Sequence, residues 1–355
     1  MFVPVKMFTL QLKTVVKMEL TRPIKSIETL INKYHESQQQ KPRYHFGLSM
    51  AGHHCERWMW LSFRWAVVEK FDGRMLRLFR RGHNEESILN EDLKSIGMEI
   101  QYTGYNQYTV DFGCHVKGHL DGIIMYGVPE APLKRHVLEE KTHNKKSFDD
   151  LVKNGVEESK PMHYAQMQVY MHGSKIDRAL YVAVCKDDDR LHTERVKYKK
   201  SVATKLVDKC KRIAMSEAPP PPISDKSDWY QCKMCAAHDL CHDSKLTKEV
   251  NCRTCAHSTP KEDSTFFCER YQRTIPNEKQ QTAYPCHVLH PDLVPWDYVE
   301  AHDRWHVNYI IDGEKALNGK DGFKSTEIVA NPKACAVNNE FTQTLRDEFD
   351  AKVTG

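Results

Sequence analysis

The segment His136–Lys141 (HVLEEK) has the pattern of a β-strand but carries three charged residues. Residues two apart on a strand project from the same face, so Glu139 and Lys141 share one face and Glu140 takes the other. The triplet alone carries no information, because acid-x-Lys occurs elsewhere in the chain, as in Asp92–Lys94. Its meaning therefore depends on the residues that accompany it.

Three further groups of polar residues accompany this strand. Asp121 is the charged residue of an otherwise apolar stretch, GHLDGII. His83 and Glu86 are three residues apart on one expected helix, and Gln166 and Tyr170 are four apart on another. Each pair therefore shares a helix face and can point at the same place as the strand residues.

This combination predicts a divalent-metal site. Carboxylates of Asp121, Glu139 and Glu86 brought within about 4 Å would repel by roughly 4 kcal/mol per pair at an effective dielectric near 20. Bound Mg²⁺ or Mn²⁺ removes that repulsion, and His83 is a further donor that suits Mn²⁺ better. Such a metal polarises a phosphodiester and acidifies a water, while Lys141 orients the water or stabilises developing charge. The alternative is a set of solvated charges at strand ends.

The ordered set resembles the RecB-like branch of the PD-(D/E)xK nuclease superfamily over roughly residues 45–245. The resemblance is carried by Gly82-His83-x-x-Glu86, Gly118-x-x-Asp121, Glu139-x-Lys141 and Gln166-x-x-x-Tyr170. It implies that His83, Asp121 and the Glu139–Lys141 pair hold the metal and do the chemistry. It also implies that the helix with Gln166 and Tyr170 contacts DNA and supports the site. One departure is Leu120, which stands where the family pattern has proline.

The expected fold is an α/β, restriction-endonuclease-like core, a mixed central sheet flanked by helices, with a C-terminal cysteine-rich zinc module. Hydrophobic periodicity predicts the elements of this core. They are helices over 49–70, after Gly82, and over 161–172 and 201–215, and strands over 99–108, 114–125, 136–141, 179–185 and 192–198. We expect three regions: residues 1–44 as an N-terminal extension and helix, 45–245 as the nuclease domain, and 246–355 as the zinc module and tail. Residues 1–17 are either an extension upstream of Met18 or an edge strand.

Seven of the twelve cysteines lie between Cys232 and Cys286, at metal-ligand spacings. The first set, Cys232-x2-Cys235-x5-Cys241, supplies three thiolates, one short of a closed site. His238, His242 or a distant cysteine could complete it. Here the chain is similar to the iron–sulfur nucleases of CRISPR adaptation and the AddB type, which implies a [4Fe–4S] cluster with Cys55 as fourth ligand. Zinc with a local histidine is the rival.

The second set is complete by itself. Cys252-x2-Cys255 followed by Cys268 and Cys286 resembles a structural zinc knuckle, with His257, His287 and His290 in reserve. Because no secretory signal or membrane-length apolar run is visible, we expect a cytoplasmic protein, in the host if phage-encoded, whose thiols stay reduced. Metal binding then explains the spacing better than disulfides do.

The expected function is a Mg²⁺- or Mn²⁺-dependent deoxyribonuclease, in exonuclease mode. A net charge of +4 is too small to indicate nucleic-acid binding by itself. Basic residues near the site, namely Arg80, Arg81, Lys145 and Lys146, are candidates for phosphate contacts. The resemblance extends to phage recombination or DNA-processing nucleases, with a recombination or single-strand-binding protein as partner. The alternative class is a catalytically inactive DNA-binding or interaction protein on the same fold.

Overall fold

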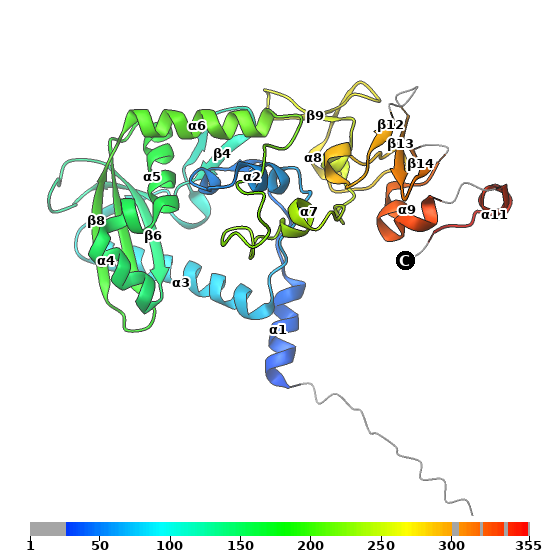
Figure 1. The fold of residues 1–355 in the computed structure, drawn as a ribbon. Coiled ribbons are helices and arrows are strands. Elements are labelled where there is room, and N and C mark those ends of the chain that lie inside the picture. The colour runs from blue at the N-terminus through cyan, green and yellow to red at the C-terminus, as the bar shows by residue number, and fades with distance from the viewer. Residues whose placement is uncertain (1–25, 300–304, 320–321, 337–339, 354–355) are drawn as a thin grey trace, which may run out of the picture.

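The computed structural model describes residues 26–299, 305–319, 322–336 and 340–353, so the expectation for residues 1–17 lies outside the described residues. Its centre is a five-stranded mixed sheet in the order β2-β5-β6-β7-β8 (Figure 1). The strands are β2 (Glu99–Gln101), β5 (Gly122–Tyr126), β6 (His136–His143), β7 (Arg178–Cys185) and β8 (Leu191–Lys197). The β6 and β7 strands are parallel and the other neighbours antiparallel.

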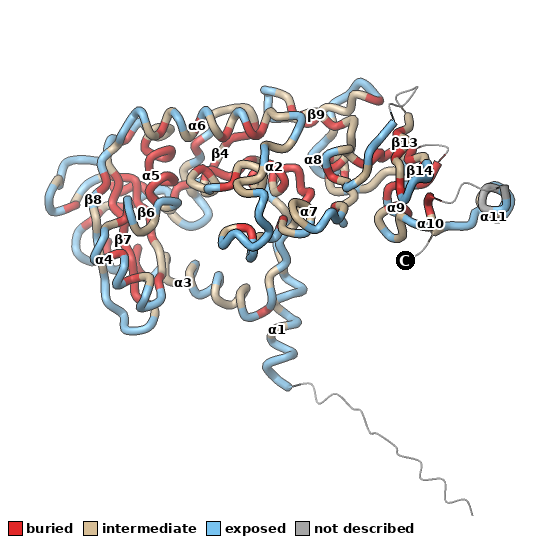
Figure 2. The backbone as a smooth tube through the Cα atoms, viewed as in Figure 1, coloured by how far each residue is buried: buried red, intermediate tan, exposed pale blue. Residues whose placement is uncertain are grey.

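Strand alternation gives this sheet two buried faces. Leu138, Leu180 and Val182 pack with Leu89 and Leu93 of α3 (Gly73–Ser95) on one face. The other face carries Val137 and Tyr181 in a separate core with residues of α4 (Lys145–Ser159) and α5 (Pro161–Ser174). The α6 helix (Lys200–Met215) packs on α5. The centre of the sheet is therefore an internal layer between helices: β5, β6 and β7 are largely buried, whereas the edge strands β2 and β8 are more exposed (Figure 2). The expected mixed sheet flanked by helices is confirmed.

A second sheet, β1-β4-β3, lies beside the first. It comprises β1 (Phe46–Gly47), β3 (Thr109–Asp111) and β4 (Val116–His119). The sequence predicts one strand over 114–125, but the structure divides it into β4 and β5, with Leu120 and Asp121 between them. This division takes Asp121 out of a regular ladder and leaves its carboxylate at the junction of the two sheets.

Two helices differ from expectation. The helix expected over 49–70 is a short turn, η1 (Leu48–Met50), followed by α2 (Glu56–Phe63), whose N-cap is Cys55. The α3 helix begins at Gly73, where the Asp72 side chain accepts a hydrogen bond from the Met75 amide at 2.7 Å. A Cβ atom at Gly73 would stand 2.3 Å from the Cα of Asn32, so glycine permits α1 (Ile27–Ser37) to cross there.

The chain after α6, called the C-terminal region below, has more regular structure than its sequence predicts. It contains a sheet of β9 (Ser258–Pro260), β10 (Phe266–Cys268) and β11 (Arg273–Ile275). A further sheet consists of β12 (Tyr298–Val299), β13 (His306–Ile311) and β14 (Glu314–Gly319). The remaining elements are η3 (Cys252–Thr254), α7 (His238–His242), α8 (Asn277–Gln280), η4 (Pro291–Leu293), α9 (Ser325–Ala330), α10 (Pro332–Cys335) and α11 (Glu340–Phe349), together with η2 (Gly104–Asn106) of the core.

Buried arginines join this region to α2. The Arg253 guanidinium donates to the carbonyls of Phe63 at 2.8 Å and Tyr44 at 2.7 Å, and it lies 3.9 Å from the centre of the Trp65 ring. Arg64 donates to the Ser258 carbonyl at 2.7 Å. Neither guanidinium has a carboxylate partner among the described residues, so backbone carbonyls and aromatic faces compensate for their burial. None of the described helices has the length and apolar character required to span a membrane.

Candidate active site

Asp121, Glu139 and Lys141 meet at the edge between β5 and β6. The antiparallel register pairs Gly122 with Leu138, which places Asp121 beside the start of the charged segment. The Lys141 ammonium lies 3.1 Å from Asp121 Oδ2 and 2.6 Å from Glu139 Oε1. Burial lowers the pKa of Lys141, but the attraction of the two carboxylates outweighs burial and raises this pKa well above 10.5. The lysine is therefore a fixed positive charge between two acids.

Glu139 is completely buried and is held from the α5 side. Its Oε2 accepts a hydrogen bond from Gln166 Nε2 at 3.1 Å. Burial raises the pKa of Glu139 to about 8, with Lys141 opposing the rise and Asp121 adding to it. The carboxylate is thus crowded by other acids, which is a setting that a bound cation would relieve. Glu139 and Lys141, which are predicted to share one strand face, are in contact at 2.6 Å, and Gln166 reaches Glu139 from α5.

Glu140 projects to the α3 side, as alternation requires, but it is not remote from the site. Its Oε2 accepts from Asn90 Nδ2 at 2.9 Å, and its amide donates to Asp121 Oδ2 at 3.2 Å. Burial raises the pKa of Glu140 to about 9, and repulsion from Asp121 and Glu86 adds to the rise. Its Oε1 is buried without a hydrogen-bond partner. Neither the crowding of Glu140 by other acids nor its contact with Asn90, four residues after Glu86 on α3, is predicted from the sequence.

The open side of the site is a cleft of about 940 Å³. Its lining includes His83, Glu86, Asp121, Gln166 and Tyr170, whereas the buried Glu139 does not reach it. Burial, followed by repulsion from Asp121, raises the pKa of Glu86. Burial also raises the pKa of Tyr170, so its hydroxyl remains protonated.

Gly118 lets Tyr170 approach the site. A Cβ at position 118 would lie 2.9 Å from the Tyr170 hydroxyl, so the close contact depends on glycine. This is a physical reason for the predicted Gly118-x-x-Asp121 spacing.

The chemistry of the donor set fits a divalent cation. Four carboxylates, those of Glu86, Asp121, Glu139 and Glu140, surround one ammonium, and oxygen donors are what Mg²⁺ and Mn²⁺ bind. The side chains are not gathered around one point, however. Among the described residues, the only three His, Cys, Asp or Glu side chains whose ligand atoms all lie within 4.8 Å of one another are His238, Asp239 and Asp243. Lys245 already pairs with both of those aspartates.

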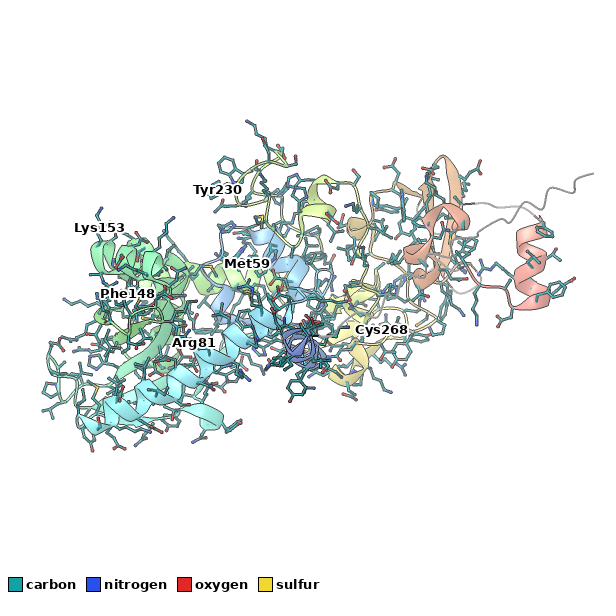
Figure 3. The ribbon with its side chains drawn as sticks, turned by 90° about the horizontal axis from the view of Figure 1, so that it is seen from below. Met59, Arg81, Phe148, Lys153, Tyr230 and Cys268 are labelled. Carbon is teal, nitrogen blue, oxygen red and sulfur yellow. The ribbon has the colours of Figure 1, made fainter. Side chains whose placement is uncertain are left out.

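The predicted phosphate-contacting residues lie at the edge formed by α3 and α4, and Figure 3 labels Arg81 on this side. Arg81 donates to the Lys186 carbonyl at 2.8 Å. Lys145 stands 3.5 Å from Asp149 and 3.7 Å from Asp188. Arg80 and Lys146 are exposed. Two of the four predicted contacts are therefore already engaged within the protein.

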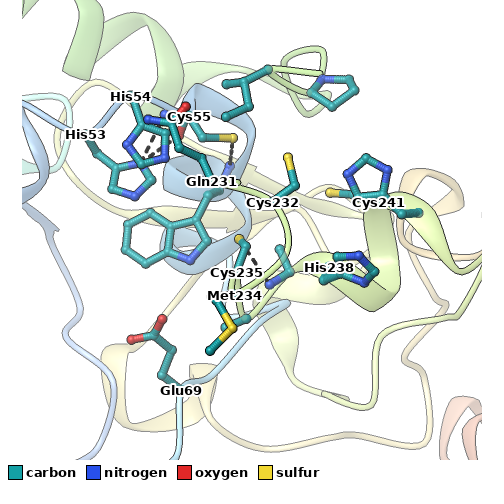
Figure 4. A pocket seen from close by; sticks show the side chains of 16 residues that line it. His53, His54, Cys55, Glu69, Gln231, Cys232, Met234, Cys235, His238 and Cys241 are labelled. Atoms are coloured by element: carbon teal, nitrogen blue, oxygen red, sulfur yellow. Dashed lines mark hydrogen bonds between the residues drawn. The ribbon is translucent and has the colours of Figure 1, made fainter. Parts of the chain in front are cut away.

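Cys55 lies with the first cysteine set in spite of its distance in the sequence. Cys55, Cys232, Cys235 and Cys241 all line one cavity of about 240 Å³, as Figure 4 shows. The Trp58 amide donates to Cys55 Sγ and the Ala237 amide to Cys235 Sγ, each at 3.4 Å. Burial raises the pKa of the Cys235 thiol, and the hydrogen bond from Ala237 opposes this rise. A single tetrahedral ion would hold sulfurs about 3.8 Å apart, since Zn–S bonds are about 2.3 Å. Among the described residues, no three of these four sulfurs lie within 4.8 Å of one another. His238 and His242 line the same cavity.

The second cysteine set also gathers around one cavity. Cys252, Cys255, Cys268 and Cys286 line a space of about 30 Å³ that also contacts His257. His287 and His290 are engaged elsewhere: His287 hydrogen-bonds the Asn251 carbonyl and Ser325, and His290 the Glu217 carbonyl. His257 Nε2 is buried without a hydrogen-bond partner. The donors suit zinc, although no three of these sulfurs lie within 4.8 Å of one another among the described residues.

Comparison with known proteins leaves the family open. No protein-family model and no curated protein matches the chain. Among solved structures, the chain is similar to one titled SSO0001, with 15% identity, a TM-score of 0.39, and coverage of 61% of this chain and 96% of that one. It is also similar to LHK-Exo in complex with dAMP, at 14% identity and a TM-score of 0.36, over 51% and 89% of the two chains. A further structure is the LHK-Exo alkaline exonuclease from Laribacter hongkongensis, at 15% identity and a TM-score of 0.33, over 51% and 90%.

Proposed function

We propose that this chain is a metal-dependent DNA nuclease that hydrolyses phosphodiester bonds at Asp121, Glu139 and Lys141. The observation that carries the proposal is the Lys141 ammonium between two carboxylates, 3.1 Å and 2.6 Å away, one of which, Asp121, lines a large cleft. Such a set serves phosphoryl chemistry, because the acids can bind a metal and the lysine can meet negative charge on the transition state.

Asp121 and Glu139, with His83 and Glu86 from α3, would hold Mg²⁺ or Mn²⁺. That ion would polarise the phosphodiester and lower the pKa of a bound water. Lys141 keeps its proton in this setting, so it acts as an electrostatic and hydrogen-bonding group and not as a general base. Gln166 fixes the rotamer of Glu139, and Tyr170 supplies a protonated hydroxyl to the cleft wall.

The test is incubation of end-labelled linear DNA and closed circular DNA with Mg²⁺ or Mn²⁺. Degradation of the linear DNA alone, lost in Lys141→Met, is the expected result and establishes an exonuclease. Cleavage of both establishes an endonuclease. DNA binding without cleavage under every metal condition would instead support an inactive DNA-binding protein.

We also propose that Cys55, Cys232, Cys235 and Cys241 bind a [4Fe–4S] cluster. The support is a shared cavity of about 240 Å³ lined by four thiols, one of which precedes the others by 177 residues (232 − 55). Four cysteine thiolates are the ligand set of such a cluster. Cys252, Cys255, Cys268 and Cys286 are proposed as a structural zinc site, supported by their common cavity. A role in phage recombination, with a single-strand-binding or recombination protein as partner, is the biological setting proposed.

A further inference from the structure

A groove lined with basic residues continues from the catalytic cleft toward the C-terminal region. It measures about 430 Å³, and Arg43 and His45 line both the cleft and the groove. One wall includes Lys41, Arg43 and Lys117, and the other comes from the C-terminal region through Ser264, Asn277 and Gln281. The groove therefore joins residues from three distant parts of the chain.

The positive charge in this groove is not compensated within the described part of the chain. The side chains of Lys41, Arg43 and Lys117 make no ion pair or hydrogen bond with any described residue, and no acidic residue lines the groove. The edge at Lys145 differs, because Asp149 and Asp188 neutralise it. Unpaired cations on a concave surface attract an anionic ligand from solution.

His45 lines both the cleft and the groove and is affected by the same positive charges. Burial, together with the charges of Arg43 and Lys117, lowers the pKa of His45 to about 4, so the ring is neutral at pH 7. Its Nε2 is buried and has no partner. The permanent charge of the groove therefore belongs to the lysines and the arginine, and it does not depend on pH near neutrality.

We infer that this groove binds the sugar–phosphate backbone of the DNA strand that enters the catalytic cleft, with Arg43 and Lys117 as phosphate contacts and the C-terminal region as one wall. The inference rests on the proposed function and deepens it by assigning the path of the substrate. A backbone phosphate fits because it needs only positive charge and polar donors, which is what the groove offers, and phosphate contacts fix position without reading sequence. The C-terminal region is then part of the substrate-binding surface.

The test measures binding of a fluorescent single-stranded oligonucleotide by anisotropy over a range of salt concentrations, with no added divalent ion so that cleavage is excluded. Lys117→Ala and Arg43→Ala are each expected to weaken binding and to lower the slope of log K against log salt by roughly 0.7, the value for one lost phosphate contact on a single strand. Lys153→Ala, an exposed lysine on α4 labelled in Figure 3, is the matched control and should change neither quantity.

Asn277 provides a variant pair that does not depend on the fold of the wall. It is exposed on α8, and its Oδ1 accepts a hydrogen bond from Gln280 Nε2 at 3.1 Å. Both variants lose the Asn277 amide, but Asn277→Lys should strengthen binding and Asn277→Glu should weaken it, and melting temperatures measured for both separate charge from stability. Oligonucleotides with a 5′-phosphate, a 3′-phosphate or hydroxyls at both ends distinguish an end phosphate from an internal one. If the protein binds an oligonucleotide with a phosphate at one end more tightly, and Lys117→Ala loses this preference, the groove binds the phosphate at that end. Equal binding of all three with the same variant effects assigns it to internal phosphates.

The inference is overturned if Lys117→Ala, Arg43→Ala and Asn277→Glu bind like Lys153→Ala. Cleavage by the unmodified protein in Mn²⁺ is measured in parallel. If cleavage occurs while these variants bind normally, only the groove assignment fails. If the variants lose binding while the unmodified protein never cleaves, only the proposed nuclease activity fails.

Discussion

The carboxylate cluster and the Cys55 cavity are both assembled from distant segments, but they differ in how the protein itself fills them. In the carboxylate cluster, Lys141, Gln166 and Asn90 occupy acid oxygens at 2.6–3.1 Å. In the cysteine cavity, four thiols are among the side chains that line a space of about 240 Å³. In the first site, the Lys141 ammonium and the Gln166 and Asn90 amides already contact the acids that would bind a cation. The second site has no such ammonium: among the described residues, no lysine or arginine lines its cavity.

This difference predicts separate consequences for activity and stability. Loss of the divalent ion should stop chemistry but leave the sheet folded, because the internal cation and amides still hold the acids. Loss of the proposed cluster should loosen the link between α2 and the loop around Cys232, because it removes the bonds that tie Cys55 to the other three cysteines. The hydrogen bond between Arg57 of α2 and the Cys241 thiol would remain. Metal binding by such a site contributes directly to folding free energy.

The largest expected effect is on catalysis. Lys141→Met keeps an unbranched side chain that is one atom shorter but removes the ammonium, and we expect cleavage to fall by at least about 100-fold, as for the loss of one transition-state donor. The melting temperature should change little in Mn²⁺, because the ion replaces the lost charge. Gel assays of linear DNA and thermal melts of the same preparation test both points. A Lys141→Met protein that cleaves normally would remove this cluster from the mechanism.

The second prediction concerns the cysteine cavity. Cys55→Ser should lose iron as completely as Cys235→Ser and should melt at a lower temperature. A drop of about 2–4 °C is expected for each 1 kcal/mol lost in a domain of this size. Iron analysis of anaerobically purified protein and its visible absorbance provide the measurement. Cys210→Ser, a buried thiol outside the cavity, is the control. Full metal content in Cys55→Ser would indicate a local ligand such as His238, and zinc in place of iron.

A third prediction follows from the crowded acids. The pKa of Glu139 is raised to about 8 and that of Glu140 to about 9, chiefly by burial, from an ordinary value of 4.5. The folded chain then holds protons that the unfolded chain has lost, so the free energy of unfolding falls as the pH rises from about 7 to 9. Below this window the buried histidines, such as His163 with a pKa of about 3, act in the opposite direction.

The measurement is the melting temperature between pH 7 and 9 without divalent ions. It should fall with pH, and Mn²⁺ should reduce the fall, because metal binding requires ionised carboxylates. The double variant Glu139→Gln/Glu140→Gln should flatten the profile. A melting temperature that rises across this window would contradict the assigned shifts.

The fourth prediction compares the two cysteine sites. Cys255→Ser should release about one zinc per chain, as expected for a closed four-ligand site, and destabilise residues 246–299. Hydrogen exchange should increase in β9, β10 and β11 while the five-stranded sheet keeps its protection. The iron content should stay unchanged. Equal loss of both metals would show that the two sites form one cooperative unit.

The smallest effect is expected at Glu140. Glu140→Gln retains the hydrogen bond from Asn90 and lies on the face opposite Lys141, so cleavage should fall far less than in Glu139→Gln. Comparing kcat for the two variants at saturating Mn²⁺ tests the register of the strand. Equal losses would mean that both acids contribute to catalysis. This outcome has to be tested because the Glu140 amide contacts Asp121.

Local patterns predict the strands and helices that carry the site, and long-range contacts explain the failures. The charged strand β6 and the helix α5 are predicted because alternation and spacing are local properties of a sequence. The helix expected over 49–70 stops at Phe63 because Trp65 takes a φ of +51° and its indole donates to the Arg43 carbonyl. No local signal could find Arg43 and Lys117, since their role depends on a wall supplied by residues 264–281. The C-terminal strands escaped prediction because several are only three residues long.

The buried arginines Arg64 and Arg253 make α2 and the C-terminal region dependent on each other for hydrogen bonding. A chain cut after Ser244 would leave Arg64 without the Ser258 carbonyl, and the carbonyls of Phe63 and Tyr44 without the Arg253 donor. It would also expose aromatic rings that now cover a guanidinium. A simple fusion or deletion of the C-terminal region would therefore leave buried polar groups without partners. Any exchange of this region between proteins would have to carry α2 and its aromatic residues with it, so the two parts are expected to be inherited as one unit.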